Sequence, residues 1–314
     1  MNQPGSWNWS GRIDEEDGDA GLRWHQVVQR WVPGSNAGTA FLGLACDEGV
    51  RRNKGRVGAA AGPNALRTAM SNLPVSHKVL LYDAGDIECV GSGLEAAQDL
   101  YTGQAAQLLE DGNVVIGLGG GHEIAWASFC GLITASILKP GGRLGILNLD
   151  AHFDLRKADA PTSGTSFRQA LERACDLDFD VEYRVLGISE SSNTAALFDA
   201  AQRSGVTWRS DDQLTLSQLD LRLSELESWF STLDCLYLTI CLDVLPASVA
   251  PGVSAPAARG VPLDVIEPIV QAASRSGKLR LADVAELCPR LDSDDRTARV
   301  AARLIWRIVR EIGG

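Results

Sequence analysis

The chain has 314 residues, a length that one large α/β domain can hold. Hydrophobic residues make up 45% of it, so a sizeable core is expected and wholesale disorder is not. The formal net charge of −11 argues against nucleic acid or an anionic membrane as a partner, because binding to either needs a basic face.

No apolar run approaches membrane-spanning length, and residues 1–14 lack the basic and apolar regions of a signal peptide. The seven cysteines are scattered without CxxC spacing, which indicates reduced thiols rather than a disulfide framework. We therefore expect a cytoplasmic protein.

The first 38 residues are rich in tryptophan, glycine and aspartate, with Trp7, Trp9, Trp24 and Trp31 among them. The pattern predicts a helix from about Gly21 to Trp31. The rest of residues 1–38 is expected to form an extended arm, whose indoles pack on the domain or on a neighbouring subunit.

From residue 39 to residue 314 the pattern predicts a single domain of alternating strands and helices. Eight short, apolar, β-prone runs are present: 41–45, 79–82, 114–118, 144–149, 184–188, 206–208, 236–242 and 279–285. Stretches with helical spacing lie between most of them. Fully apolar strands that alternate with helices predict a parallel sheet covered on both faces.

Two helices are predicted in more detail. Ser92 and Glu95 have the spacing of a capping box and precede the helical run 94–110. An apolar stripe predicts a second helix over 296–312. Pro268 lies inside another apolar run and implies a kink or a later helix start.

The ligand crevice of such a sheet lies at the carboxyl ends of its strands, where the run 144–149 is followed by Asp150, His152 and Asp154. Alternate side chains of an extended backbone share one face, so these three are expected to converge. Ala151 and Phe153, which alternate with them, are expected to turn into the core. Two carboxylates and an imidazole suit a divalent cation such as manganese, zinc or iron. The alternative is a solvated loop with three unrelated polar residues.

Two further strand ends carry polar groups. The run 114–118 leads into three glycines and His122, which stands where a dinucleotide-binding GxGxxG loop would need its third glycine. His122 is thus either delivered to the crevice or structural. Cys241 and Asp243 are two residues apart at the end of another strand and can reach the same crevice. A small buried hydrophobe is the alternative for Cys241.

These runs resemble the ureohydrolase superfamily of arginases and agmatinases and, within it, the formimidoylglutamase branch. The matching runs are Gly-Gly-Gly-His-Glu at 119–123, Asp-Ala-His-Phe-Asp at 150–154, Leu-Asp-Val-Leu-Pro at 242–246 and Ala-Pro-Gly-Val-Ser-Ala-Pro at 250–256, supported by 49–56, 83–87, 163–165 and 282–287. Gly121 and Glu123 favour this branch, since arginases usually have Gly-Asp-His there. The resemblance spans about residues 7–310, in chain order.

The resemblance implies a three-layer α/β/α fold with an eight-stranded parallel sheet and two Mn2+ ions per subunit. One ion would be held by His122, Asp150 and Asp154, and the other by Asp150, His152 and Asp243, with a carboxylate at the position of Cys241 touching both. The superfamily often forms trimers or hexamers, which leaves a homo-oligomer open.

The implied reaction is hydrolysis of N-formimidoyl-L-glutamate, a step of histidine degradation, to L-glutamate and formamide by attack of a metal-bridging hydroxide on the amidine carbon. Glu286 matches the superfamily's acidic residue that pairs with the cationic amidine or guanidinium, and it is assigned a catalytic and substrate-binding role. Arg156 occupies a position where arginases contact the substrate carboxylate. Arg51, Arg52 and Arg56 are weaker candidates for the same task.

Cys241 departs from the family pattern, which has a carboxylate at this position. Sulfur is softer than a carboxylate and offers one donor atom. Three outcomes follow: an altered metal preference, a single metal, or a catalytically impaired relative. Two rival functions are a guanidino-acid or agmatine-type ureohydrolase and a catalytically silent scaffold. A nucleotide-binding oxidoreductase is a distant third, disfavoured by His122.

Overall fold

The computed structural model describes residues 8–75, 79–139 and 141–312, which are built around one parallel sheet. The strands are β1 (Gln29–Arg30), β2 (Thr39–Ala45), β3 (Leu81–Glu88), β4 (Val114–Gly119), β5 (Arg143–Leu149), β6 (Asp180–Ile188), β7 (Thr207–Ser210), β8 (Cys235–Cys241) and β9 (Leu279–Ala285). Their order across the sheet is β1-β3-β2-β4-β9-β8-β5-β6-β7.

The eight strands expected from the apolar runs are present as β2 to β9, but the sheet of the described chain has nine strands rather than eight. The ninth, β1, pairs with β3 through Gln29 and Arg30 only. Both residues are exposed, so the segment has no apolar alternation that could have revealed a strand. Its pairing is a tertiary contact at the edge of the sheet.

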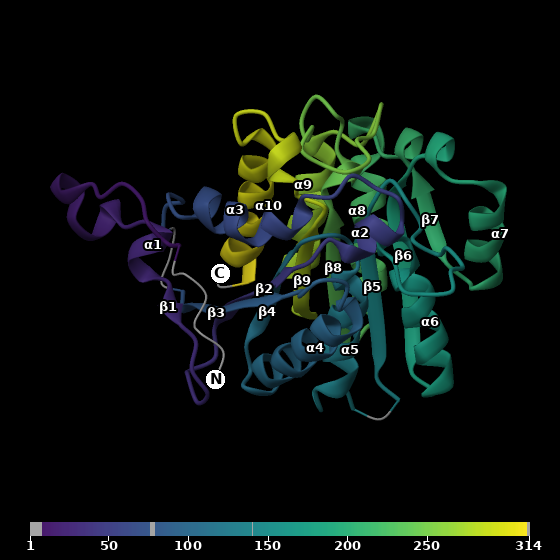
Figure 1. Ribbon diagram of the computed structural model, residues 1–314, viewed down its shortest axis with the longest axis horizontal. Helices are drawn as coiled ribbons and strands as arrows, with labels where there is room; N and C mark the ends of the chain where they lie inside the picture. Colours follow the sequence, from purple (N-terminus) through teal and green to yellow (C-terminus); the bar gives the residue numbers. More distant parts are fainter. Residues whose placement is uncertain (1–7, 76–78, 140, 313–314) are drawn as a thin grey trace.

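Helices cover both faces of the sheet in three layers (Figure 1). The helices are α1 (Trp24–Val27), α2 (Glu48–Arg52), α3 (Gly62–Met70), α4 (Leu94–Glu110), α5 (Ile124–Thr134), α6 (Ser166–Asp176), α7 (Ala195–Arg203), α8 (Leu219–Phe230), α9 (Leu263–Arg275) and α10 (Arg296–Ile312). One layer contains α3, α10, α9 and α8, which contact one another in that order, and α4, α5 and α6 do so in the opposite layer.

Side chains of each central strand alternate between these two layers. In β5, Leu144 and Ile146 belong to the core on the α4–α6 side, whereas Leu147 and Leu149 belong to the core under α8 to α10. All four are completely buried. The strands read as continuously apolar because both of their faces are covered.

The predicted helices 94–110 and 296–312 are confirmed as α4 and α10. The predicted capping box is wrong, because α4 has Gly93 as its N-cap and no side-chain cap. Glu95 instead accepts hydrogen bonds from Arg52, which comes from a distant part of the sequence. The later helix start suggested by Pro268 is also wrong, since α9 begins at Leu263 and includes Pro268.

The predicted helix from Gly21 to Trp31 is mostly wrong, because only the four residues of α1 are helical and β1 follows. The tryptophans do pack on the domain: the rings of Trp9 and Trp24 lie 5.6 and 5.7 Å from that of Phe41. Trp7 lies outside the described residues. Contact of the arm with a neighbouring subunit stays a prediction.

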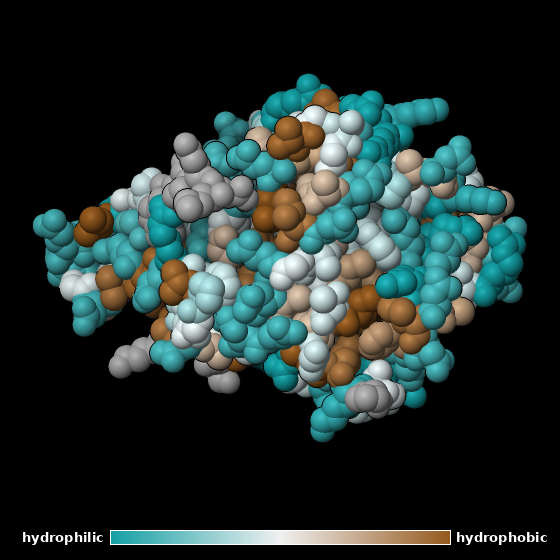
Figure 2. Space-filling view, turned by 60° about the horizontal axis from the view of Figure 1, so that its bottom comes forward, coloured by the Kyte–Doolittle hydropathy of each residue, from teal (hydrophilic) through white to brown (hydrophobic). Residues whose placement is uncertain are grey.

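Figure 2 shows one face of the molecule, on which hydrophobic side chains lie in separate groups among hydrophilic ones. Over the stretches of chain that the structure describes, helices with the length and apolar character to cross a bilayer are absent.

Candidate metal centre

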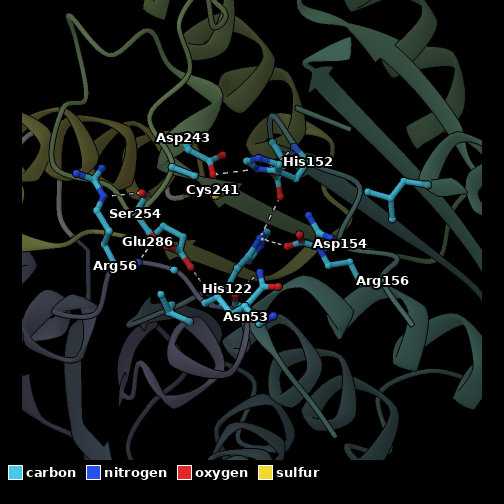
Figure 3. Close-up of a pocket in the computed structure, with 17 residues that line it drawn as sticks. Asn53, Arg56, His122, His152, Asp154, Arg156, Cys241, Asp243, Ser254 and Glu286 are labelled. Carbon is cyan, nitrogen blue, oxygen red and sulfur yellow. Dashed lines mark hydrogen bonds and ion pairs between the residues drawn. The ribbon is translucent and has the colours of Figure 1, made fainter. Parts of the chain in front are cut away.

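The strand order brings the three predicted strand ends together with the end of β9. Strands β4, β9, β8 and β5 are consecutive in the sheet, and all of their pairings are parallel, so their carboxyl ends form one edge. The side chains at this edge are His122 after β4, Glu286 after β9, Cys241 and Asp243 at the end of β8, and Asp150, His152 and Asp154 after β5. Figure 3 shows them gathered around one pocket.

Asp150 is the centre of this cluster, lying between the two histidines. Its two carboxylate oxygens lie 3.0 Å from Nδ1 of His122 and 3.5 Å from Nδ1 of His152. Asp154 approaches Nδ1 of His122 to 2.9 Å, and Asp243 approaches Nδ1 of His152 to 3.1 Å. His122 and Asp243 therefore both lie against the 150–154 turn.

Two donor sets of metal-binding size share Asp150. One consists of Asp150, His152 and Asp243, and the other of Asp150, His122 and Cys241, with the donor atoms of each set within 4.8 Å of one another. The first set is the predicted second site. In the other set the cysteine stands beside His122 and Asp150, and Asp154 reaches the same histidine nitrogen from another side.

The 150–154 turn is held by the side chain of Asn193. Ala151 and Phe153 are buried, as predicted, although the backbone is bent rather than extended beyond Leu149. The Asn193 side chain donates to the Ala151 carbonyl and accepts from the Phe153 amide. Asp154 has a φ of 50°, a left-handed conformation that few residues other than glycine adopt. Such strain is typical of functional sites.

Glu286 also has a left-handed backbone, with a φ of 72°. Its Oε1 accepts the backbone N–H of His122 at 2.9 Å, which fixes the carboxylate over the end of β4. Burial raises the pKa of Glu286 to about 8, and the charges of Glu123 and Asp243 add to the effect. The carboxylate is thus poised to ionise next to a cation.

The charges of the site are strongly coupled. Burial opposes protonation of His122 and His152, but the neighbouring carboxylates raise the pKa of both imidazoles well above its usual value. Burial also opposes ionisation of Asp150, and hydrogen bonds from the two histidines nevertheless lower its pKa. Burial and the charges of Asp150 and Asp243 raise the pKa of the Cys241 thiol.

The donor set fits a divalent cation. Nδ1 of His122 is buried and has no hydrogen-bond partner among the described residues, although oxygens of Asp150 and Asp154 lie about one hydrogen-bond length away. If the imidazole is neutral with its proton on Nε2, the lone pair of Nδ1 faces the lone pairs of the Asp150 and Asp154 oxygens. A cation between them converts that repulsion into binding.

A cavity of about 390 Å3 opens onto this cluster, a size suited to a small molecule. Its wall includes the cations Lys54, Arg56 and Arg156, so the predicted Arg156 lies at the site. None of the three forms an ion pair within the described part of the chain. Arg51 and Arg52 are instead bound to Glu48 and lie outside the lining.

The arginines on opposite walls are placed by backbone contacts (Figure 3). Arg56 donates from Nε to the carbonyl of Ser254 at 2.9 Å and from the adjacent guanidinium nitrogen to the carbonyl of Val253 at 2.8 Å. Arg156 passes over Gly164, where a Cβ atom would lie 2.9 Å from the arginine Cδ. The Arg56 guanidinium therefore has a restricted position, and among the described residues neither arginine has its charge neutralised by an ion pair.

Some lining residues were not assigned a role from the sequence. Asn53, Ser163 and Ser254 line the cavity, and Asn53 donates to the Ser163 hydroxyl at 3.2 Å. All three lie in the runs 49–56, 163–165 and 250–256 that carried the family resemblance. The runs thus marked the segments, but only the packing of the loops shows which side chains face the cavity.

The sequence matches the family model described as arginase family over residues 37–310. The chain is 54% identical to the formimidoylglutamase of Ralstonia nicotianae over 306 residues, covering 96% of this chain and 94% of that protein. It is 51% identical to the formimidoylglutamase of Aromatoleum aromaticum over 313 residues, covering 97% and 92%.

Solved structures with the same fold are also found. The formimidoylglutamase of Bacillus subtilis aligns with a TM-score of 0.83 at 24% identity, over 99% of this chain and 96% of that one. A Trypanosoma cruzi formiminoglutamase solved with Mn2+2 aligns with a TM-score of 0.75 at 27% identity, over 87% of this chain and 92% of that one.

Proposed function

Because this chain belongs to the arginase family, we propose that it is a metal-dependent hydrolase that converts N-formimidoyl-L-glutamate and water to L-glutamate and formamide. The observation that carries this proposal is the pairing, within one cavity, of an acidic cluster of metal-ligand type with three unneutralised cations. The substrate has the complementary pattern, with one amidine and two carboxylates. Relatives named formimidoylglutamase cover nearly the whole chain.

Six side chains would hold two divalent cations, with Mn2+ as the first choice because a related formiminoglutamase was solved with it. They are His122, Asp150, His152, Asp154, Cys241 and Asp243. When bound, the cations would supply the positive charge that lowers the pKa of a water molecule and so provides the nucleophile. The protein residues orient the substrate for this attack.

Glu286 would receive the amidine end of the substrate. Its carboxylate is held by the His122 amide, and a cationic amidinium beside it would lower its raised pKa and keep it ionised. The resulting charge-assisted hydrogen bonds fix the plane of the amidine and present its carbon to the nucleophile. The bond between that carbon and the glutamate nitrogen then breaks, and the amine leaves with a proton.

Arg156 and Arg56 would bind the two carboxylates from opposite walls, with Lys54 beside them. A guanidinium binds a carboxylate with two parallel hydrogen bonds, and a preplaced guanidinium loses little entropy in doing so. The same cations disfavour agmatine, which carries a positive charge at both ends. A guanidino acid with one carboxylate is the stronger rival substrate.

The reaction is tested by incubating the purified protein and Mn2+ with N-formimidoyl-L-glutamate, 4-guanidinobutyrate or agmatine, and by measuring formamide and urea. Formamide from the first compound supports the proposal. Urea from a guanidino compound without any formamide would replace it with a ureohydrolase function.

The two arginines are tested with Arg156→Ala and Arg56→Ala, using Arg51→Ala as the matched control because Arg51 is bound to Glu48 outside the cavity. Loss of a charged hydrogen-bonding partner should lower kcat/KM by roughly 10–100-fold, mostly through KM. A substrate analogue that lacks one carboxylate should be insensitive to loss of the arginine that binds it. Equal effects on both compounds would refute the assignment.

Cys241 supports a second outcome for the same site, in which the protein is catalytically impaired. The thiol lies within one donor set with His122 and Asp150, where it must lose a proton that burial and nearby carboxylates retain. If the purified protein holds no metal, and Cys241→Asp neither holds metal nor hydrolyses any amidine, the enzymatic function is wrong and a scaffold role is favoured.

A further inference from the structure

Asp283 is a buried carboxylate for which the metal-ligand and substrate-binding roles above give no use. It lies in the middle of the central strand β9, three residues before Glu286, and it is completely inaccessible to solvent. No Lys, Arg or His side chain in the described ranges forms an ion pair with it. A carboxylate in this position is costly, so a compensating interaction is expected.

Neutral hydroxyl groups surround it. Ser128 from α5 and Tyr237 from β8 donate to Oδ2 at 2.7 and 2.6 Å, which satisfies one carboxylate oxygen. The other oxygen, Oδ1, is buried and has no well-aligned hydrogen bond among the described residues. Asp283 therefore retains an acceptor that faces the interior of the sheet.

Thr239 is the group beside Asp283 in the neighbouring strand. It is the direct partner of Asp283 in the register of β8 and β9, and burial raises the pKa of the Asp283 carboxyl while the Thr239 hydroxyl acts in the opposite direction. The same hydroxyl oxygen lies 2.9 Å from Nε2 of His122. Asp283, Thr239 and His122 thus form a chain of polar groups that leads from the core of the sheet to the site.

The direction of the hydrogen bonds follows from this order. If the Thr239 hydroxyl donates to Asp283, its oxygen is left to accept, so Nε2 of His122 must carry the proton. Nδ1 then presents its lone pair to the Asp150 and Asp154 oxygens. Phe167 packs edge-on against the imidazole, with ring centroids 5.4 Å apart, and limits rotation of the ring.

We propose that Asp283 is a positioning residue that acts through Thr239 to hold His122 as the Nε2–H tautomer, with Nδ1 aimed at a divalent cation. This inference rests on the metal site of the proposed function. Outer groups that fix the tautomer of a ligating histidine typically change metal affinity by roughly 10–100-fold. The Asp283–Thr239 pair would do so from inside the sheet, without contact with metal or substrate.

The test compares Asp283→Asn and Thr239→Val, which keep the size of each side chain. The expected result is a fall in Mn2+ affinity of roughly 10–100-fold in each variant, measured by competition with a chelator. Because the two groups act in one chain, the double variant should lose little more than either single one. Tyr237→Phe is the matched control: it removes a hydrogen bond from Asp283 outside the chain and should leave Mn2+ affinity within about twofold.

A second measurement separates positioning from folding. Nitrogen-15 NMR of the metal-free protein, which has four histidines in all, reports the tautomer of His122 directly at a pH above its raised pKa, where the imidazole is neutral. A dominant Nε2–H form that is lost in both variants supports the series of hydrogen bonds from Asp283 through Thr239 to His122. Weakened metal binding in variants that unfold at the normal temperature supports it as well. Unchanged Mn2+ affinity in Thr239→Val, or additive effects of the two substitutions, would overturn it.

The NMR result also distinguishes this inference from the proposed function. If the unaltered protein binds no divalent cation, the metal-dependent function fails, but the tautomer of His122 in the metal-free protein still supports or refutes the role of Asp283. If metal binding and formamide release are normal in Asp283→Asn, the inference alone fails.

Discussion

Cys241 is the single residue on which the metal chemistry of this protein depends most. Its thiol forms a donor set of metal-binding size with His122 and Asp150 at the end of a central strand, where the family resemblance implies a carboxylate. Sulfur favours zinc or iron over manganese, and it offers one donor atom where a carboxylate offers two. We therefore predict a site whose preference among divalent metals differs from that of a site with a carboxylate at position 241.

We expect Cys241→Asp to bind Mn2+ at least about tenfold more tightly and to be faster with Mn2+, because a carboxylate restores a hard ligand with two oxygens. Metal content and Mn2+ affinity of the purified proteins are the measurements. Cys241→Ser is the control, since it changes sulfur to oxygen without adding a charge. Tighter Mn2+ binding by the unaltered protein than by Cys241→Asp would contradict the prediction.

A pH prediction follows from the two histidines of the cluster. Their raised pKa values mean that the folded, metal-free protein binds these protons more tightly than the unfolded chain. The stabilisation is complete below about pH 6.5, the unfolded value, and it is lost as the pH rises through the folded-state pKa values. Urea unfolding with a chelator present should therefore show falling stability above about pH 6.5.

Metal binding should have the opposite pH dependence. A divalent cation displaces the protons of His122 and His152, so Mn2+ affinity should rise with pH by up to about tenfold per unit for each proton displaced. Chelator competition at several pH values measures this slope. An affinity that does not change between about pH 6 and pH 9 would mean that the histidines do not ligate the metal.

At the scale of single elements, the arm before β2 contributes to the domain through a few anchored side chains. Trp9 is buried, stacks at an angle on Phe41 and donates from Nε1 to Asp83 at 2.5 Å. Arg67 of α3 binds the same carboxylate with two hydrogen bonds, at 2.7 and 2.9 Å. The arm thus covers a buried ion pair beside the edge of the sheet.

Trp9→Ala should destabilise the fold by about 3–5 kcal/mol, because it removes a buried ring and leaves Asp83 with one partner fewer. Trp9→Phe keeps a ring but loses the hydrogen bond, and we expect a loss of about 1–2 kcal/mol. Urea unfolding measures both. Val32→Ala, at an exposed position in the same arm, is the control and should change stability by less than about 0.5 kcal/mol. Equal effects at positions 9 and 32 would refute the anchoring role.

For the whole molecule, metal binding at this site would be linked to the stability of the folded state. The edge formed by β4, β9, β8 and β5 gathers four carboxylates and two imidazoles, and cations bound there would stabilise the native state alone. At a hundredfold excess over Kd, the linkage amounts to about 2.7 kcal/mol.

Removal of metal with a chelator should therefore lower the Tm by about 2–4 °C, and Mn2+ but not Mg2+ should restore it. Mg2+ is the control because it prefers oxygen ligands and keeps its water shell. Thermal unfolding followed by circular dichroism is the measurement. An unchanged Tm across chelator, Mg2+ and Mn2+ would mean that the cluster does not bind these cations in the folded protein.

Other whole-molecule expectations stay predictions. A cytoplasmic location and a homo-oligomer follow from composition and from family resemblance, and the division into an arm of residues 1–38 and a domain of residues 39–314 also awaits an experiment. Size-exclusion chromatography with light scattering would measure the oligomeric state.

The sequence alone determined the secondary-structure pattern and the residue types of the site. Fully apolar runs predicted strands such as β5, because burial on both faces selects apolar side chains throughout. The residues of 150–154 predicted a metal-ligand cluster, because few other arrangements tolerate such charges together. Short local features were less predictable: Ser92 and Glu95 fit a capping box, but Glu95 binds Arg52 instead.

Only the tertiary structure decided which groups meet. Strand order is set by how the helices pack on both faces, and it places β9 between β4 and β8, so Glu286 lies beside His122 although 164 residues separate them. The same order pairs Asp283 with Thr239 and leaves Arg56 and Arg156 facing one cavity while Arg51 and Arg52 bind Glu48. Residue type determines what a side chain can bind, whereas long-range packing determines which partner it reaches. The sequence specifies that partner only through the fold.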